Sequence, residues 1–164
     1  MSLQTAKESG RVKVGIADAE ISTDRELLTT SGVGSCLGVA LFDREREIGG
    51  LVHIMLPKGG DTVENEWKYA DTGIEALVNE LEKAGVNRDQ LVAKVAGGSD
   101  MLSFQSSEDS IGERNIEAVR SELEEREIPL EAEDVGGNHG RSIEVNPAMG
   151  SVQVTSAKQE DKLL

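Results

Sequence analysis

The first part of the chain alternates between short apolar runs and polar segments, a pattern typical of β-strands and their connections. Apolar and polar residues alternate over Val12–Ala17, which predicts a first strand. The polar segment Asp18–Glu26 predicts a loop. Leu27–Thr30 is a short β-prone stretch that enters the glycine-punctuated turn Ser31–Cys36. Two strands are therefore expected before this turn.

Two apolar runs around a charged segment predict a β-hairpin. The runs are Cys36–Phe42 and Ile48–Leu56, and the charged segment between them is Asp43–Glu47. Pro57 follows the second run and ends it, because proline cannot donate a hydrogen bond to a neighbouring strand. The hairpin is expected to be a central part of the sheet.

The register of this hairpin decides whether Cys36 meets His53. With the connecting loop centred between Arg44 and Glu45, the two residues lie directly opposite each other, with Cβ atoms roughly 4.5–5.5 Å apart. A slip of one residue would place them on opposite faces of the sheet. A bulge at Gly49–Gly50 would also change the pairing.

Helical spacing of apolar residues appears twice later in the chain. It predicts helices over Glu66–Ala84 and Ile111–Glu127. Leu91–Ala96 and Leu130–Asp134 have the composition of strands, and residues 142–154 predict a final hairpin. This order of elements indicates an α/β (α+β) fold, a layered sandwich in which two main helices pack on a mixed or antiparallel sheet.

The length of 164 residues fits one domain. We expect a folded domain over residues 11–156, a disordered amino-terminal arm over residues 1–10 and a flexible carboxy-terminal tail over residues 157–164. A single cysteine excludes an intramolecular disulfide. With no bilayer-length apolar run and no leader pattern, this favours a cytoplasmic protein without membrane insertion.

The chain is strongly acidic, with a formal net charge of −14. This charge argues against nucleic acids and anionic membranes as partners. The acids are spread along the chain, as on an ordinary solvated surface. The same surface would also suit a halophile-like protein in a cytoplasm of high salt concentration, and the sequence leaves both interpretations open.

Cys36 is a candidate nucleophile, because it is the only thiol and lies on a tight turn next to a strand. Alone, it is more typical of a small buried hydrophobe, and His53 alone is typical of a half-buried strand residue. Together they would let the imidazole take the thiol proton and lower the thiol pKa. Backbone amides at Gly34 and Ser35 could bind an oxyanion, and Thr30 could orient the ring.

Other chemistries find little support in the sequence. There is no second cysteine for a redox pair or a thiolate metal site. There is no phosphate-binding loop, no dinucleotide fingerprint and no calcium-loop spacing. We therefore expect neither a metal nor a cofactor.

Several short segments, in order and with matching spacing, make the chain similar to the CheD family of chemoreceptor glutamine deamidases. The resemblance covers most of Val12–Val154. The segments are Gly32–Cys36, His53–Pro57, Lys68–Thr72, Ala96–Gly98, Ile111–Asn115 and Glu133–Asn138.

This resemblance implies hydrolysis of glutamine side-chain amides on the cytoplasmic helices of chemoreceptors. It implies Cys36 as nucleophile, His53 as base and Thr30 as the third member, in a layered α/β sandwich. It also implies binding to the CheC phosphatase. Four further residues are assigned to a substrate or partner surface: Tyr69, Phe104, Arg114 and Asn138.

Two other functions remain open at this point. The protein could be a non-catalytic binding module that docks on CheC or on receptors. It could also act as an esterase on methylated receptor glutamates, because a thioester route serves both reactions.

Overall fold

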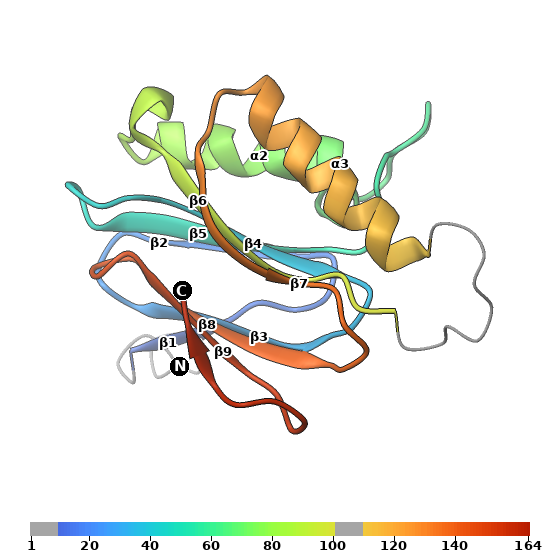
Figure 1. The fold of residues 1–164 in the computed structure, drawn as a ribbon. Coiled ribbons are helices and arrows are strands. Elements are labelled where there is room, and N and C mark those ends of the chain that lie inside the picture. Colours follow the sequence, from blue (N-terminus) through green and yellow to red (C-terminus); the bar gives the residue numbers. More distant parts are fainter. Residues whose placement is uncertain (1–9, 101–109) are drawn as a thin grey trace, which may run out of the picture.

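The structure, a computed structural model, describes residues 10–100 and 110–164. Its elements form three layers (Figure 1): two α-helices lie over one face of a five-stranded sheet, and a second five-stranded sheet packs on the opposite face. We call the sheet between the two other layers the central sheet, and the second one the outer sheet.

The central sheet has the strand order β2-β5-β4-β6-β7. All its neighbours are antiparallel except β6 and β7, which are parallel. Its strands are β2 (Ala19–Ser22), β4 (Leu37–Asp43), β5 (Ile48–Ile54), β6 (Val92–Gly97) and β7 (Leu130–Val135). The predicted hairpin β4–β5 therefore lies in the middle of this sheet.

The outer sheet has the order β1-β3-β8-β9-β10, with β1 and β3 parallel and the other pairs antiparallel. An irregularity between Thr30 and Val33 ends the regular pairing of β3 with β8. The strands are β1 (Arg11–Lys13), β3 (Leu27–Val33), β8 (Arg141–Asn146), β9 (Ser151–Thr155) and β10 (Lys162–Leu163).

The helices are α2 (Ala70–Lys83) and α3 (Ile111–Glu125), with short 3₁₀ turns η1 (Glu66–Lys68) and η2 (Arg88–Gln90). α3 begins at Ser110, whose hydroxyl accepts a hydrogen bond from the Glu113 amide at 3.1 Å. Such a side-chain cap satisfies one of the amides that a helix start leaves unpaired.

Two apolar layers hold the sheets and helices together. β4 contributes side chains to both apolar layers, because successive side chains of a strand point to opposite faces of the sheet. Leu37, Val39 and Leu41 pack toward the helices, whereas Ala40 and Phe42 pack toward the outer sheet. The central sheet is thus covered on both faces, which explains why its strands read as nearly continuous apolar runs.

The predicted fold class is confirmed: the protein is a mixed α/β structure of layered sheets and two helices. The strands divide between two sheets instead of one, which the sequence pattern did not separate. β2 lies inside the segment that was expected to be a loop. Residues 157–164, expected to form a tail, include β10, which pairs with β9.

The predicted hairpin register is wrong by two residues. Asp43 belongs to β4 and pairs with Ile48, so the turn is formed by residues 44–47. The Asp43 carboxylate holds this turn by accepting hydrogen bonds from the amides of Glu45 and Arg46 at 2.9 and 3.2 Å. As a result, Gly38 lies opposite His53.

Gly112, in the first turn of α3, allows the helix to approach the end of β6 closely. A Cβ at this position would lie 2.5 Å from the carbonyl oxygens of both Gly98 and Ser99. Backbone atoms cannot move aside as a flexible side chain can, so an added methyl group would force the helix away. We expect Gly112→Ala to lower the free energy of unfolding by roughly 1–3 kcal/mol.

Urea denaturation measures this change, and Gly60→Ala is the matched control, because a Cβ at Gly60 meets no atom within 4 Å. Equal stability of the two variants would contradict the close packing of α3 on this loop.

Candidate active site

The predicted catalytic residues come from three segments that meet at one end of the two sheets. Thr30 lies in the middle of β3 in the outer sheet, and His53 lies near the end of β5 in the central sheet. Cys36 lies in the bend Gly34–Cys36 that connects β3 to β4. This is the end at which α3 begins (Figure 1).

A hydrogen bond joins Thr30 to His53 across the space between the sheets. Thr30 Oγ1 lies 2.8 Å from His53 Nδ1 and also donates to the Val14 carbonyl at 2.8 Å. A hydroxyl has a single proton. Because Val14 takes that proton, we assign the hydrogen on the imidazole to Nδ1, which donates to Thr30.

This tautomer leaves Nε2 of His53 as a free acceptor. The side chain is fully buried, and Nε2 has no hydrogen-bond partner among the described residues. Burial lowers the pKa of His53, because removal from water disfavours the charged imidazolium. At neutral pH the ring therefore has an available lone pair, as a general base needs.

The position of the imidazole is also held by its backbone. The His53 amide donates to the Asp18 carbonyl, and the His53 carbonyl accepts from the Ala17 amide, both at 3.0 Å. Ala17 has a positive φ of 57°, a conformation that residues other than glycine adopt rarely. The segment before β2 thus supports the strand that carries His53.

The observed register determines which residues of β4 share a face with His53. His53 points toward the outer sheet, where Thr30 lies, and a Cβ on Gly38 would point the same way, toward Ile143. Cys36 is two residues before Gly38. Such a diagonal neighbour across an antiparallel pair lies roughly 7–8 Å from its partner. Cys36 itself lies in the bend directly before β4, outside the paired residues, so this spacing is the expectation that the register gives.

The thiol and imidazole are not hydrogen-bonded to each other in this structure. Cys36 is half-buried, and burial raises its pKa, with a hydrogen bond from its own backbone amide acting in the opposite direction. The sequence analysis expected the imidazole to lower this pKa, so the shift has the opposite sign. Both groups are neutral here, because neither shift favours a charged form at neutral pH.

The bend Gly34–Cys36 is fixed through its carbonyl groups. The Gly34 carbonyl accepts from the Ser99 amide at 2.9 Å, and the Cys36 carbonyl accepts from the Gly98 amide at 2.8 Å. The Ser35 carbonyl accepts from the Asn115 side chain at 2.9 Å. Gly97 permits this approach, since it has a φ of 128° and a Cβ there would collide with the Cys36 carbonyl.

A buried ion pair stabilises the loop that holds this bend. Arg141 donates to Asp134 at 3.0 Å, to Ser99 Oγ at 2.9 Å and to the Gly136 carbonyl at 2.9 Å. The Ser99 hydroxyl in turn donates to the His139 carbonyl at 2.6 Å. No role was predicted for this network or for Asn115, although Asp134 and Asn115 lie in two of the segments that resemble the CheD family.

The residues predicted to form a substrate or partner surface lie in different environments. Arg114 and Asn138 are exposed, and Phe104 lies outside the described residues. Tyr69 is half-buried and lines a cleft of about 430 Å³ together with Met55 and the exposed Ile16. This cleft borders the segment that directly follows β5.

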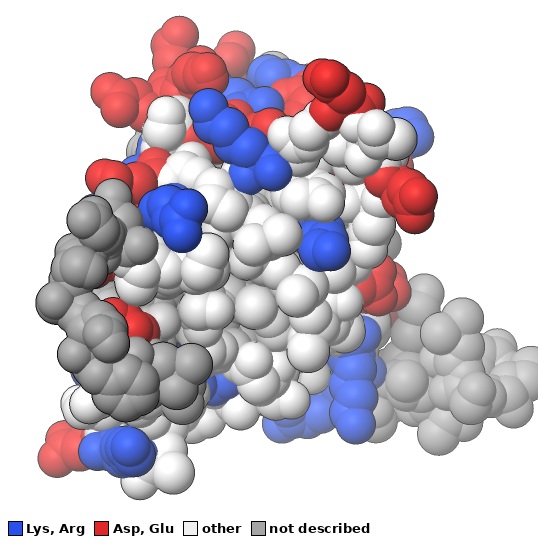
Figure 2. All heavy atoms as spheres, turned by 90° about the vertical axis from the view of Figure 1, so that its right-hand side faces the viewer, with Lys and Arg blue, Asp and Glu red and all other residues white. Residues whose placement is uncertain are grey.

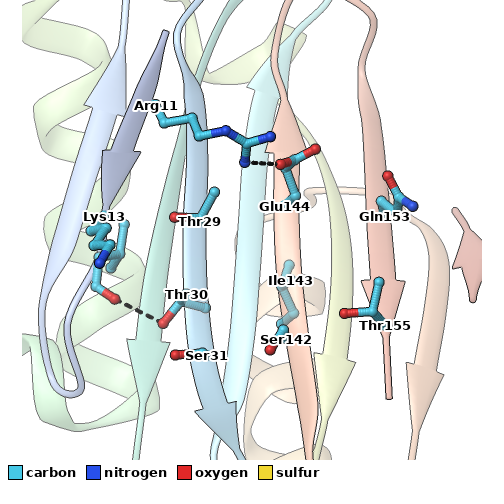
Figure 3. A pocket seen from close by; sticks show the side chains of 11 residues that line it. Arg11, Lys13, Thr29, Thr30, Ser31, Ser142, Ile143, Glu144, Gln153 and Thr155 are labelled. Atoms are coloured by element: carbon cyan, nitrogen blue, oxygen red, sulfur yellow. Dashed lines mark hydrogen bonds and ion pairs between the residues drawn. The ribbon is translucent and has the colours of Figure 1, made fainter. Parts of the chain in front are cut away.

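A larger hollow, of about 500 Å³, lies on the open face of the outer sheet (Figure 3). Polar side chains such as Gln153 and Thr155 line it, and an ion pair between Arg11 and Glu144 spans it. Thr30 also lines this hollow, but its hydroxyl is engaged by Val14 and His53. Neither Cys36 nor His53 lines this hollow.

At the end of the molecule where α3 begins, the segments that carry the candidate residues lack acidic and basic side chains. Neither Leu27–Phe42 nor Ile48–Pro57 contains an Asp, Glu, Lys or Arg residue. Figure 2 views the molecule from this side, and the middle of the face is mostly uncharged, with acidic side chains concentrated at its upper edge.

Among residues 10–100 and 110–164, no group of three or more His, Cys, Asp or Glu side chains could hold a metal ion. In the same residues, no helix has the length and apolar character needed to cross a membrane.

Comparison with known proteins gives a consistent result. The family model described as "CheD chemotactic sensory transduction" matches residues 55–156. The "Probable chemoreceptor glutamine deamidase CheD" of Haloarcula marismortui is 46% identical over 151 residues, covering 92% of this chain and 87% of that protein.

Two further relatives are named "Chemoreceptor glutamine deamidase CheD". The protein of Halalkalibacterium halodurans is 45% identical, and the alignment covers 92% of this chain and 96% of that protein. The protein of Bacillus subtilis is 42% identical, and the alignment covers 93% of this chain and 95% of that protein. The solved structure of the Bacillus licheniformis hypothetical protein YfiH aligns with a TM-score of 0.47 and 18% identity, over 71% of this chain and 49% of that one, a distant likeness. On the family model and these relatives, the chain belongs to the CheD family.

Proposed function

We propose that this protein hydrolyses the side-chain amides of glutamines on the cytoplasmic helices of chemoreceptors, giving glutamate and ammonia. Cys36 is the nucleophile, His53 is the general base and Thr30 orients the imidazole. The observation that supports this most directly is the bonding of Thr30, which donates to Val14 and leaves Nε2 of His53 as the acceptor.

The reaction begins with transfer of the thiol proton to Nε2 as Sγ attacks the Cδ atom of the glutamine. A C–S bond forms, and the carbonyl oxygen becomes an oxyanion that accepts hydrogen bonds from amides of the Gly34–Cys36 bend. Nε2 then gives its proton to the leaving nitrogen. The C–N bond breaks, and ammonia leaves behind a thioester.

Water completes the cycle. Nε2 takes a proton from the water as its oxygen attacks the thioester, and the C–S bond breaks to return the thiol with that proton. The products are glutamate and the starting enzyme. General acid–base help of this kind contributes roughly 10²–10⁴ in rate, which makes His53 and its orientation a large part of the catalysis.

The absence of Asp, Glu, Lys and Arg from Leu27–Phe42 and Ile48–Pro57 suits a protein substrate. Repulsion between an acidic enzyme and acidic receptor helices is reduced where such uncharged segments meet the substrate. CheC is proposed to dock on the same face, which would make it a competitor of the receptor. A non-catalytic docking role on this face is the alternative that the next experiment separates.

Cys36→Ala is expected to abolish deamidation and to leave receptor binding intact, because it removes only the sulfur. Mass spectrometry of a receptor cytoplasmic fragment should show a gain of about 1 Da per site with the wild-type protein and none with the variant, because each replaced NH₂ becomes OH. Wild-type protein that binds the fragment without any mass change would favour the docking role.

Thr30→Val is expected to lower kcat by roughly 10²-fold, because valine has a similar shape but cannot accept from Nδ1 of His53. Thr30→Ser is the matched control and should retain most of the activity, since it keeps the hydroxyl. Ammonia release at saturating receptor fragment measures both. Full activity of the valine variant would exclude Thr30 from the mechanism.

The substrate-free thiol is expected to titrate above the ordinary cysteine pKa, because burial favours its neutral form. The rate of iodoacetamide alkylation should therefore still be rising at pH 8.5, roughly the pKa of free cysteine. His53→Gln should change this profile little, since the imidazole is neutral and not bonded to the thiol. A midpoint below the ordinary value that rises in His53→Gln would instead show an ion pair in the free enzyme.

A further inference from the structure

We propose that Asn115 is a positioning residue for catalysis: its side-chain amide holds the Ser35–Cys36 peptide so that the Cys36 N–H faces the oxyanion. This inference rests on the proposed function and adds to it a residue on α3, outside the three segments that carry the catalytic side chains.

Asn115 uses both hydrogens of its amide to join two parts of the site. Nδ2 donates to the Ser35 carbonyl and to the Met55 carbonyl, each at 2.9 Å. Ser35 directly precedes the nucleophile, and Met55 is two residues after His53. One fully buried side chain therefore ties the segment that carries the thiol to the segment that carries the base.

The bond to Ser35 sets the direction of the Cys36 amide. In a trans peptide the C=O and N–H groups point in opposite directions. Because Asn115 holds the Ser35 carbonyl toward α3, the Cys36 N–H of the same peptide must point away from that helix. It lies on the thiol side, where it interacts with Cys36's own sulfur. When the sulfur attacks the glutamine Cδ, the oxyanion forms on that carbon and can accept a hydrogen bond from the Cys36 N–H.

The carbonyl groups of the two neighbouring peptides are also held by hydrogen bonds. The Gly34 carbonyl is bound by the Ser99 amide and the Cys36 carbonyl by the Gly98 amide. These two donors belong to the backbone, so no substitution except proline removes them. Asn115 is the one side chain among the described residues that donates to a carbonyl of the bend.

The chemistry of Asn115 is costly for a residue with only a packing role. Asparagine is a poor helix former, and Asn115 Oδ1 is buried without a hydrogen-bond partner among the described residues. An unpaired buried acceptor destabilises a protein. An apolar residue would avoid both penalties, so its two donated bonds are the features that account for an amide here.

The test replaces Asn115 with leucine, which has a similar shape but no donor and no charge that could alter the thiol. We expect Asn115→Leu to lower kcat for ammonia release by roughly 10²-fold, the loss typical of removing an oxyanion donor, with KM changed less than about threefold. Alkylation of Cys36 by iodoacetamide should stay within about threefold, because that reaction forms no oxyanion.

The control is Leu123→Ala, a core truncation in the same helix that does not touch the bend. It should lower the melting temperature and leave kcat within about threefold, since a smaller core does not move the amides of the bend. If Asn115→Leu does not fold, Asn115→Ala is measured in its place, with the same split expected between ammonia release and alkylation.

Three results would overturn the inference: an unchanged kcat, an equal loss of kcat in Leu123→Ala, or a parallel loss of alkylation, which would mean that the thiol itself had moved. Wild-type protein that releases no ammonia from the receptor fragment would instead refute the proposed function, and the inference with it.

Discussion

The chemistry of this site depends on the single proton of the Thr30 hydroxyl. That proton is donated to the Val14 carbonyl, so the hydroxyl can only accept from His53, and the imidazole must keep its hydrogen on Nδ1. Thr30 and Val14 belong to the layer of the outer sheet, whereas His53 belongs to the central sheet. The packing of two sheets thus determines which nitrogen is available as a base, a property that neither sheet could set alone.

The rest of the site is arranged by close approach of backbones. Gly112 lets α3 lie against the carbonyls that follow β6, and Gly97 lets the end of β6 lie against the Cys36 carbonyl. These contacts bring amide donors to the carbonyls of the bend Gly34–Cys36. The N–H groups of the same peptides therefore point away from those donors. A flexible loop would lose this arrangement to conformational entropy, whereas here the three carbonyls of the bend are held by the two amides that follow β6 and by Asn115 on α3.

Sequence patterns identified most elements because their periods are strong: both helices and the β4–β5 hairpin lie close to their predicted bounds. They missed β2, because its four residues are too short a run to stand out in a polar segment. They misplaced the hairpin register, because Asp43 was counted with the turn. Cys36, His53 and Thr30 were proposed from pairing and from family resemblance, and their catalytic roles remain predictions. The sign of the thiol pKa shift was missed, since burial between layers is a property of the tertiary structure.

A hydroxyl as the third group, in place of a carboxylate, has a consequence for reactivity. A buried carboxylate would stabilise the imidazolium and so favour a thiolate before substrate arrives. Thr30 is neutral, and burial keeps both His53 and Cys36 uncharged. The thiolate is the form that reacts with oxidants and alkylating agents. A neutral resting pair therefore protects the only cysteine of the protein, and confines proton transfer to the moment when an amide carbon accepts the sulfur and the bend receives the oxyanion.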